Sequence, residues 1–546
     1  MGGIRNYNAA ALLSVALWSA AACADDPPGA SPETSPPAAP KPRVQTFPVS
    51  EIQVSGNSLL LPDVIQTAME PFTGPEKSPD DIEAARDSLE KLYRELGYKT
   101  VTVSIPKQSA RDGVIRLDVA ETPVHKINIV GDKYTSRDQL RSEIPALAQN
   151  EVPNFEDLQK DLVYANRMGS RRVTPALHAT TTPGVVDIDL MVEDHPAFQA
   201  SGEYNNRYSK GTSDTRAVVN ASYDNLWQRG HSFSFMFQTA PQRIDDGKVY
   251  YAAYVARIGD SDWSVQGSGL WSNSDVAAFT GIDVVGKGYT YGLRLIRQLD
   301  GIEGLLYPSI SFGIDYKHQN NISQLGSSAV ETPLDYYPIT LGYSQLLRGE
   351  TQSLQSDVSL VFAYRASGSD QAELDDARLG ARGQSLYLRA SNNYSIDFLR
   401  YFTGALRVTG QITDQPLVSG EQLNVGGMDS VRGYLEAEAA GDYGYVGSVE
   451  LKFPSIPELF AGTQFARGLQ DFRPFAFADT AEVTVRPPYP DSSTRHSSRL
   501  FSWGGGLSMR IYDHLSGVLD YSMPERDGPY TKKGDYRVLF KVSASL

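Results

Sequence analysis

The chain has 546 residues, with 65 acidic and 50 basic side chains and a formal net charge of −15. This charge argues against nucleic acid as a partner, because binding to phosphates requires a basic surface. Cys23 is the only cysteine, so the sequence excludes a disulfide framework and thiolate catalysis in the remainder of the chain.

Residues 1–24 are predicted to form a secretory signal peptide. Arg5 precedes an apolar stretch from Ala9 to Ala24 that ends in small residues. Two alternatives are a buried N-terminal helix and a lipoprotein signal that is acylated at Cys23. Residues 25–46 are a linker rich in proline, alanine and serine, which predicts an extended tether without helix.

Residues 47–122 and 123–195 are predicted to be two copies of one β-α-α-β-β unit. The glycine turn at Gly56-Asn57 ends the first strand of one unit, and Gly131-Asp132 occupies the same place in the other. Each unit has about 75 residues, enough to enclose a small core. We expect these elements at 50–55, 60–72, 81–96, 101–105 and 114–119, then at 127–132, 136–147, 154–167 and 184–190. The pattern also fits two generic α+β modules.

From residue 196 to residue 546 the helical period disappears and apolar residues alternate with polar or small ones. Phe233, Phe235 and Phe237, for example, alternate with Ser232, Ser234 and Met236. A soluble sandwich would also alternate, but these segments are longer than usual soluble strands and carry aromatic residues near their ends. After a signal peptide, such a region predicts an all-β transmembrane barrel of about 16 antiparallel strands.

The sixteen expected strands lie at 197–207, 216–226, 232–242, 249–259, 262–273, 287–299, 305–319, 334–347, 351–365, 383–398, 401–413, 443–455, 469–485, 499–512, 514–524 and 535–546. Their longest connection is 414–442, between the eleventh and twelfth strands. This loop is rich in glycine and charge and carries one arginine, Arg432, at its centre. A solvated surface loop is the simplest interpretation of it.

Four motifs resemble the outer-membrane assembly factor superfamily, which carries POTRA domains, and within it the two-partner secretion transporters. The loop contains Val431-Arg432-Gly433-Tyr434, the V-R-G-Y/F motif, followed by Gly441, Asp442 and Gly444 of the G-D-x-G-Y motif and then by Glu450. Phe477 and Asp479 resemble the F-x-D-x-G strand, with Ala481 in place of its glycine. Residues 224–230, DNLWQRG, are similar to the first-hairpin turn, and the chain ends in Leu546 where phenylalanine is more usual.

The resemblance implies that loop 414–442 folds into the lumen, where Arg432 would pair with Asp479. It implies an outer-membrane pore whose periplasmic POTRA domains bind a large exported partner, of adhesin or haemolysin type, and translocate it to the cell surface without ATP. The barrel assembly machinery would insert the pore into the membrane lipid. Many members place an N-terminal helix through the barrel, but residues 25–46 offer none, so we expect the loop alone to narrow the lumen.

Two other functions remain open. An outer-membrane insertase of the same superfamily would share the motifs, and a passive porin or receptor would leave them unexplained. No H-E-x-x-H or G-x-S-x-G motif occurs, and the seven histidines are scattered. We therefore expect no enzyme activity, no catalytic residues, no cofactor and no metal.

Overall fold

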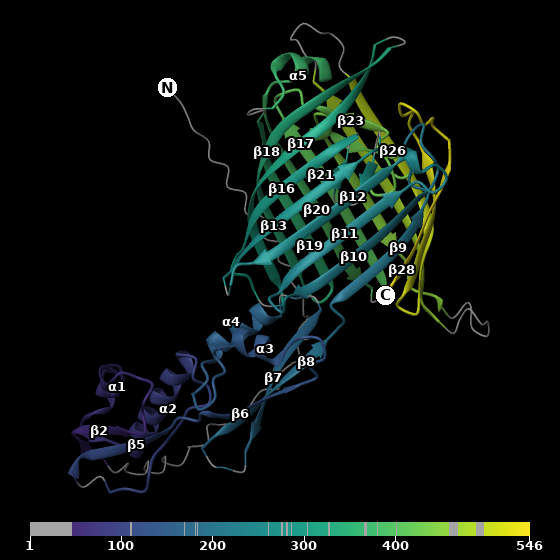
Figure 1. Cartoon of the computed structure of the whole chain (residues 1–546). Coiled ribbons are helices and arrows are strands. Elements are labelled where there is room, and N and C mark those ends of the chain that lie inside the picture. Colours follow the sequence, from purple (N-terminus) through teal and green to yellow (C-terminus); the bar gives the residue numbers. More distant parts are fainter. Residues whose placement is uncertain are drawn as a thin grey trace, which may run out of the picture.

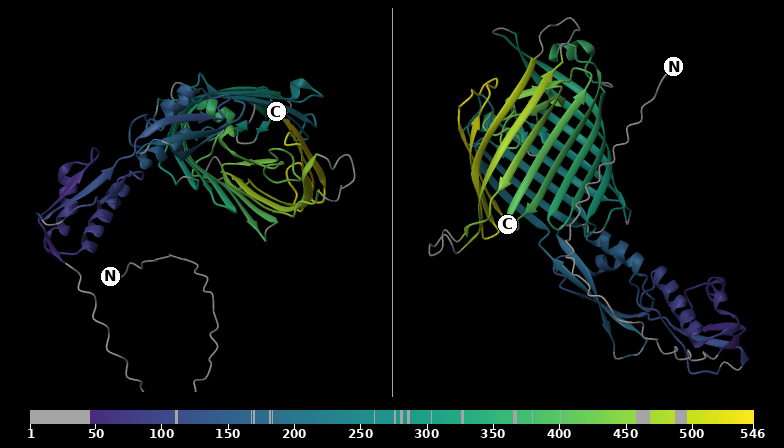
Figure 2. Two further views of the ribbon diagram at one scale, coloured as in Figure 1. Left: turned by 90° about the horizontal axis from the view of Figure 1, so that it is seen from below. Right: turned by 180° about the vertical axis from the view of Figure 1, so that it is seen from behind.

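The computed structural model describes residues 46–546, except for 110–111, 167, 169, 181, 183, 260, 275–276, 280–281, 285–286, 303, 326–327, 365–367, 379, 400, 458–467 and 487–495. The predicted signal peptide and most of the linker lie outside the described residues. Two α/β units project in a row from one end of a large barrel (Figure 1). Two further views show the same arrangement from below and from behind (Figure 2).

The first unit packs two helices against a three-stranded sheet in the order β2-β5-β4, with β2 parallel to β5. Its helix α2 begins after Ser78, whose side chain and Asp81 form a reciprocal capping box. One face of α2 buries Ala85, Leu89 and Tyr93 against the sheet. The elements are β1 (Phe47–Val49), β2 (Glu51–Ser55), α1 (Pro62–Met69), η1 (Glu70–Phe72), β3 (Gly74–Lys77), α2 (Pro79–Glu95), β4 (Thr102–Ser104) and β5 (Val114–Ala120).

The second unit repeats this topology in the order β6-β8-β7, again with its first and last strands parallel. Its elements are β6 (Val124–Val130), α3 (Arg137–Glu143), α4 (Phe155–Ala165), β7 (Arg171–Ala179) and β8 (Val186–Asp194). The sequence pattern did not indicate β7, which contains Pro175 and begins with two arginines. Arg171 is buried in the core of this unit, where it pairs with the buried Glu143.

Sixteen antiparallel strands close the barrel, which confirms the predicted fold class. They are β9 (Phe198–Asn205), β10 (Arg216–Leu226), β11 (His231–Thr239), β12 (Lys248–Arg257), β13 (Trp263–Ser272), β16 (Lys287–Gln298), β17 (Leu306–Leu325), β18 (Ser328–Arg348), β19 (Gln352–Tyr364), β20 (Gln384–Phe398), β21 (Phe402–Thr413), β24 (Tyr443–Lys452), β25 (Leu469–Val485), β26 (His496–Ile511), β27 (Leu515–Pro524) and β28 (Arg537–Ser545). The last strand pairs with the first.

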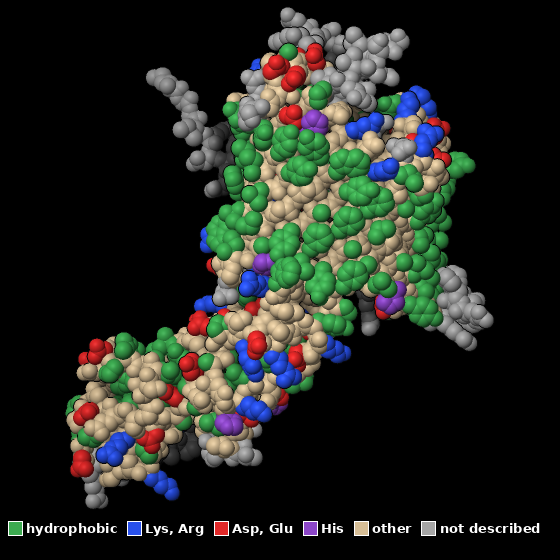
Figure 3. All heavy atoms as spheres, viewed as in Figure 1, with side chains coloured by type: hydrophobic (Ala, Val, Ile, Leu, Met, Phe, Trp, Pro, Cys, Tyr) green, Lys and Arg blue, Asp and Glu red, His purple; other side chains and the backbone are tan. Residues whose placement is uncertain are grey.

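Large apolar side chains are spread over the face of the barrel that Figure 3 shows, and exposed apolar residues occur on all sixteen barrel strands. Leu295, Phe312, Leu341 and Leu360 are exposed and lie opposite one another in register across β16, β17, β18 and β19. A continuous exposed apolar surface of this kind is unfavourable in water and favourable in lipid. None of the helices among the described residues is both long and apolar enough to cross a membrane.

Three features of the barrel region differ from the sequence prediction. The region contains a helix, α5 (Gln371–Ala377), in the connection between β19 and β20, although no helix was expected after residue 196. Strands β17 and β18 are longer than expected and continue as a hairpin at the far end of the barrel (Figure 1). A further hairpin, β14 (Ala277–Phe279) with β15 (Ile282–Val284), lies between β13 and β16.

The first turn of the barrel holds the second unit in place. The side-chain amides of Gln139, on α3, and Asn225 exchange two hydrogen bonds of 3.0 and 2.9 Å. Gln228 accepts from the N–H of Ser136 at 2.9 Å. Asn225, Trp227 and Gln228 all have positive φ angles of 60°, 61° and 55°. Such backbone is costly for residues other than glycine, so this turn, found in the sequence as DNLWQRG, is shaped by its contact with α3.

Candidate functional site: the loop inside the barrel

Loop 414–442 forms a small folded body inside the barrel. A 3₁₀ turn, η4 (Ser419–Glu421), leads into a hairpin of β22 (Leu423–Val425) and β23 (Ala439–Gly441). Val425, Val431 and Tyr434 are buried in a cluster with side chains of β25 and β26. The hairpin thus packs on the inner wall through an apolar core, unlike a solvated surface loop.

Arg432 makes several hydrogen bonds to the inner wall of the barrel. Its Nε and Nη2 donate to the two carboxylate oxygens of Asp479 at 2.7 and 2.9 Å, and its backbone N–H adds a bond of 3.0 Å. Nη1 donates to Glu450 at 2.7 Å, and the guanidinium lies 3.4 Å from the ring centre of Phe477. Arg432 is 4% exposed and Asp479 is fully buried. Burial alone would lower the pKa of Arg432, but Asp479 and Glu450 raise it.

The neighbours of Arg432 fix the backbone around it. Gly433 has a φ of 93°, and a Cβ there would lie 3.2 Å from Pro524. The hydroxyl of Tyr434 donates to the carbonyl oxygen of Arg526 at 2.8 Å, and the Tyr434 residue is 1% exposed. All four residues of the predicted motif, 431–434, therefore face protein rather than solvent.

Asp442 connects the two ends of the loop, which together form its base. Its carboxylate accepts from the guanidinium of Arg378, from the N–H of Leu417 at 3.0 Å, from Gln422 at 3.0 Å and from the N–H of Arg486 at 2.6 Å. Burial alone would raise the pKa of this fully buried acid, but Arg378 and the N–H of Arg486 hold the pKa below its ordinary value. One carboxylate thus ties together the two ends of the loop, the connection that follows α5 and the end of β25.

The two glycines beside Asp442 allow a close approach to β25. A Cβ at Gly441 would lie 2.7 Å from the backbone nitrogen of Thr484. At Gly444, which has a φ of 158°, a Cβ would lie 2.1 Å from the carbonyl oxygen of Glu482. Both positions exclude any side chain, which explains why glycine occupies them.

Glu421 is a third anchor of the loop, which no sequence motif indicated. Its buried carboxylate accepts from Lys317 at 2.5 Å, from the Tyr336 hydroxyl at 2.8 Å and from the Tyr387 hydroxyl at 2.5 Å. The three donors lie on the inner faces of β17, β18 and β20. Burial alone would raise the pKa of Glu421, but Lys317 and the two tyrosine hydroxyls together hold this pKa below its ordinary value. The start of the loop is therefore held on a different part of the barrel wall from β25, which binds Arg432.

The far end of the barrel is narrowed by a second segment, the connection that contains α5. Leu374 of α5 packs in one cluster with Leu334, Tyr336 and Val418, and Val418 belongs to loop 414–442. Arg378, just after α5, carries the contact to Asp442. The loop therefore does not narrow this end of the barrel alone, because α5 and its flanks lie against it.

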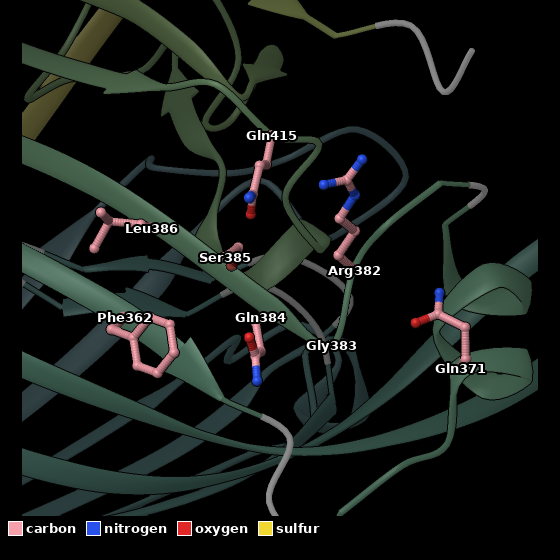
Figure 4. Close-up of a pocket in the computed structure, with 8 residues that line it drawn as sticks. All are labelled: Phe362, Gln371, Arg382, Gly383, Gln384, Ser385, Leu386 and Gln415. Atoms are coloured by element: carbon pink, nitrogen blue, oxygen red, sulfur yellow. The ribbon is translucent and has the colours of Figure 1, made fainter.

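A groove of about 430 Å³ lies beside α5 (Figure 4). Its floor includes Phe362 and Leu386, which belong to the exposed apolar face, and its polar side chains include Gln371, Arg382 and Gln415. In Figure 4 these polar groups do not converge on one point. The groove therefore lacks the arrangement of a specific ligand site. No group of histidine, cysteine and acidic residues suited to a metal ion occurs in the described part of the chain.

Comparison with known families places most of the chain in a single group. The model of the haemolysin secretion/activation protein ShlB/FhaC/HecB matches residues 184–509, and the ShlB-type POTRA domain matches residues 47–122. The outer membrane transporter CdiB of Dickeya dadantii is 24% identical over 67% of this chain and 65% of its own length. The heme/hemopexin transporter protein HuxB of Haemophilus influenzae is 19% identical over 85% of this chain and 81% of its own length.

Solved structures share the fold. CdiB from Escherichia coli superposes with a TM-score of 0.65 at 18% identity, covering 94% of this chain and 93% of that one. CdiB from Acinetobacter baumannii gives 0.60 at 16% identity, covering 92% and 90%. BamA from Haemophilus ducreyi lacking POTRA domains 1–3 gives 0.51 at 15% identity, with 92% of this chain and 100% of that chain covered.

Proposed function

This chain belongs to the haemolysin secretion/activation protein family ShlB/FhaC/HecB, and on that premise we propose that it is an outer-membrane pore that exports a large partner protein. The barrel spans the outer membrane, and residues 47–122 and 123–195 are two POTRA domains in the periplasm. The observation that carries the proposal is the folded loop inside the barrel, held by the buried Arg432–Asp479 pair. The role needs no catalytic group and no cofactor.

The pore is closed at rest by loop 414–442. An arginine that makes a bidentate pair with a carboxylate fixes both position and direction. Because both groups are buried, removing Arg432 leaves Asp479 as an unpaired buried charge, at a cost of about 3–5 kcal/mol. Removing Asp479 should cost less, because Arg432 keeps its bond to Glu450. Arg432 and Asp479 are therefore the latch, and Phe477, Gly441, Asp442 and Gly444 hold it in place.

The POTRA domains receive the partner as an extended segment, which adds to a free strand edge. In the second domain, the outer edge of β7 is partly occupied. The Asn166 side chain bonds both the N–H and the C=O of Val173, at 2.6 and 3.0 Å, and Pro175 has no N–H to offer. In the first domain, Glu90 accepts from the N–H of Val103 on β4 at 3.4 Å. A partner strand that adds to β4 or to β7 therefore displaces a capping side chain.

The partner is a large exported protein of adhesin or haemolysin type. The periplasm supplies no nucleotide, so folding of the partner outside the cell provides the free energy of export. The chain itself is inserted into the membrane by the barrel assembly machinery. The BamA-like fold leaves an insertase as the second candidate, but the transporter names of CdiB and HuxB favour export.

Deletion of the gene tests the proposal. Extracellular and surface proteins of the deletion strain and its parent are compared by quantitative mass spectrometry. We expect the loss of one very large protein, restored by the wild-type gene and not by one lacking residues 47–195. Broad loss of outer-membrane barrels would support the insertase instead, and no change in either set of proteins would refute both functions.

A further inference from the structure

The seam between the first and last strands is short. β9 and β28 are paired over five residues, from Ser201 opposite Ser545 to Asn205 opposite Lys541. Each is paired with its other neighbour over eight residues. Beyond Asn205, toward the cell surface, the side chain of Asn206 replaces a strand by bonding the C=O of Val538 and the N–H of Phe540, both at 2.8 Å. Among the described neighbouring strands of the barrel, this pair has the shortest register.

The tip of loop 414–442 binds the segment that follows β9. Arg207 Nε donates to Glu436 at 3.1 Å, and its Nη1 lies 2.7 Å from a carboxylate oxygen of Asp429. The N–H of Glu436 also donates to the carbonyl oxygen of Tyr208 at 3.1 Å. The side chains of Arg207 and Glu436 are 10% and 8% exposed. This contact is therefore largely shielded from water, where ion pairs are worth more than at the surface.

The same tip binds the segment that precedes β28. One oxygen of Glu438 accepts from the N–H groups of Tyr530 and Thr531, both at 2.7 Å. Its other oxygen accepts from the Thr531 hydroxyl at 2.9 Å. Glu438 is 2% exposed, so these bonds satisfy an acid that would otherwise be buried at high cost. The segments on both sides of the seam are thus tied to one loop.

The backbone between the two acids is shaped for this purpose. Ala437 separates Glu436 from Glu438 and has a φ of 50°. A residue with a Cβ adopts this left-handed conformation only when its surroundings impose it. Here the contacts of the two flanking carboxylates, one on each side of the seam, impose it.

We propose that Glu436 and Glu438 form a clasp across the β9–β28 seam, so that the loop closing the lumen also closes the wall. Displacement of the loop then frees Arg207 and Thr531 together, and the seam loosens at its cell-surface end when the lumen opens. This inference rests on the proposed function, since it assigns a second task to the same loop. Glu436 and Glu438 are positioning residues for the seam, not contacts of the exported protein.

The test measures seam closure directly in the full-length protein in lipid vesicles. Tyr204 and Val542 are register partners whose exposed side chains face outward, so cysteines placed at both positions form a disulfide when the seam is closed. In this background, the combined Glu436→Gln and Glu438→Gln change is expected to lower the disulfide yield several-fold. Thr531→Val, which removes only the hydroxyl donor, is expected to give a smaller decrease.

Glu525→Gln is the matched control. Glu525 lies in the same outer connection and pairs with Lys533 at 3.3 Å, without a recorded contact to the loop among the described residues. Its replacement is expected to leave the yield unchanged. An unchanged yield in the Glu436/Glu438 variant, with the barrel folded by gel mobility before and after heating, overturns the clasp. If Thr531→Val alone retains the fold and leaves the yield unchanged, the clasp is also wrong. Secretion is scored separately, so loss of the proposed function and loss of the clasp give different results.

Discussion

Replacement of Asp442 by asparagine is expected to release the base of the loop without removing the latch at Arg432. The asparagine retains one oxygen, which can still accept from the N–H of Leu417. Its NH₂ group would face the guanidinium of Arg378 and the N–H of Arg486, which are themselves donors. Two hydrogen bonds to a buried carboxylate are lost, and a positive charge is left without its partner.

The size of the effect follows from this geometry. Arg378 is 16% exposed on its side chain and Asp442 is 0% exposed, so solvent can replace little of what is lost. Breaking one side of such a buried pair costs about 3–5 kcal/mol. Since about 1.4 kcal/mol corresponds to a factor of ten, the equilibrium between closed and displaced loop should shift by about two to four orders of magnitude.

Planar-bilayer recording of Asp442→Asn against wild type provides the assay, with Arg378→Gln and the double variant completing a cycle. We expect frequent openings of larger conductance in each single variant. The double variant is expected to open less than the sum of the two effects, because it strands no charge. Wild-type conductance in Asp442→Asn would show that the loop base does not depend on this carboxylate, and full additivity would show that the two residues act separately.

Three further results are expected from the same recordings. The pKa of Asp442 is lowered in the folded protein, so Asp442 stabilises the closed loop fully above the ordinary carboxyl pKa of about 3.9. This stabilisation is lost as the pH falls through the lowered pKa. Resting conductance should therefore stay constant from pH 8 to pH 5, and a rise within that range would contradict this assignment. Gly444→Ala should open the pore and lower the thermal stability of the barrel, because its Cβ would overlap β25. The control, Gly267→Ala, lies on β13 with open space around it and should behave as wild type. Equal behaviour of the two variants would refute the steric argument. Lys317→Met leaves Glu421 buried without its cation and should raise open probability at least tenfold, as for other broken buried pairs; unchanged gating would exclude Glu421 as an anchor.

The sequence predicted the barrel because alternation with period two is repeated in every strand and each strand is long enough to show it. It did not predict α5, since seven residues are too short for a helical period to be recognised. The signal that was present is local: Asp370 and Glu373 form a capping box at the start of this helix. Strand β7 was missed because Pro175 disfavours a strand, yet proline is tolerated where its missing N–H would face an open edge.

Within the site, the family motifs predicted one contact, the Arg432–Asp479 pair. The spacing of residues along the sequence predicted no contact. Arg432 and Asp479 lie on motifs that the sequence displays, and the structure brings them within hydrogen-bonding distance. Lys317, which contacts Glu421, is one polar residue in an alternating strand and looks like any lumen-facing side chain. Contacts of that kind depend on which face of the barrel lies opposite the loop, which is set by the closure of the whole barrel and not by local sequence.

The pairing of β28 with β9 also determines when the pore can be sealed. The other neighbouring strands are consecutive in the chain, or are separated only by small hairpins or by α5, so their pairing can proceed from one strand to the next. Only the last strand can close the ring, and Thr531, which binds the loop, lies in the connection that precedes it. Until then both terminal strands have open edges, and the loop lacks one of its attachments. We therefore expect sealing of the lumen to be the final event of biogenesis, so that an unfinished barrel is a leaky one.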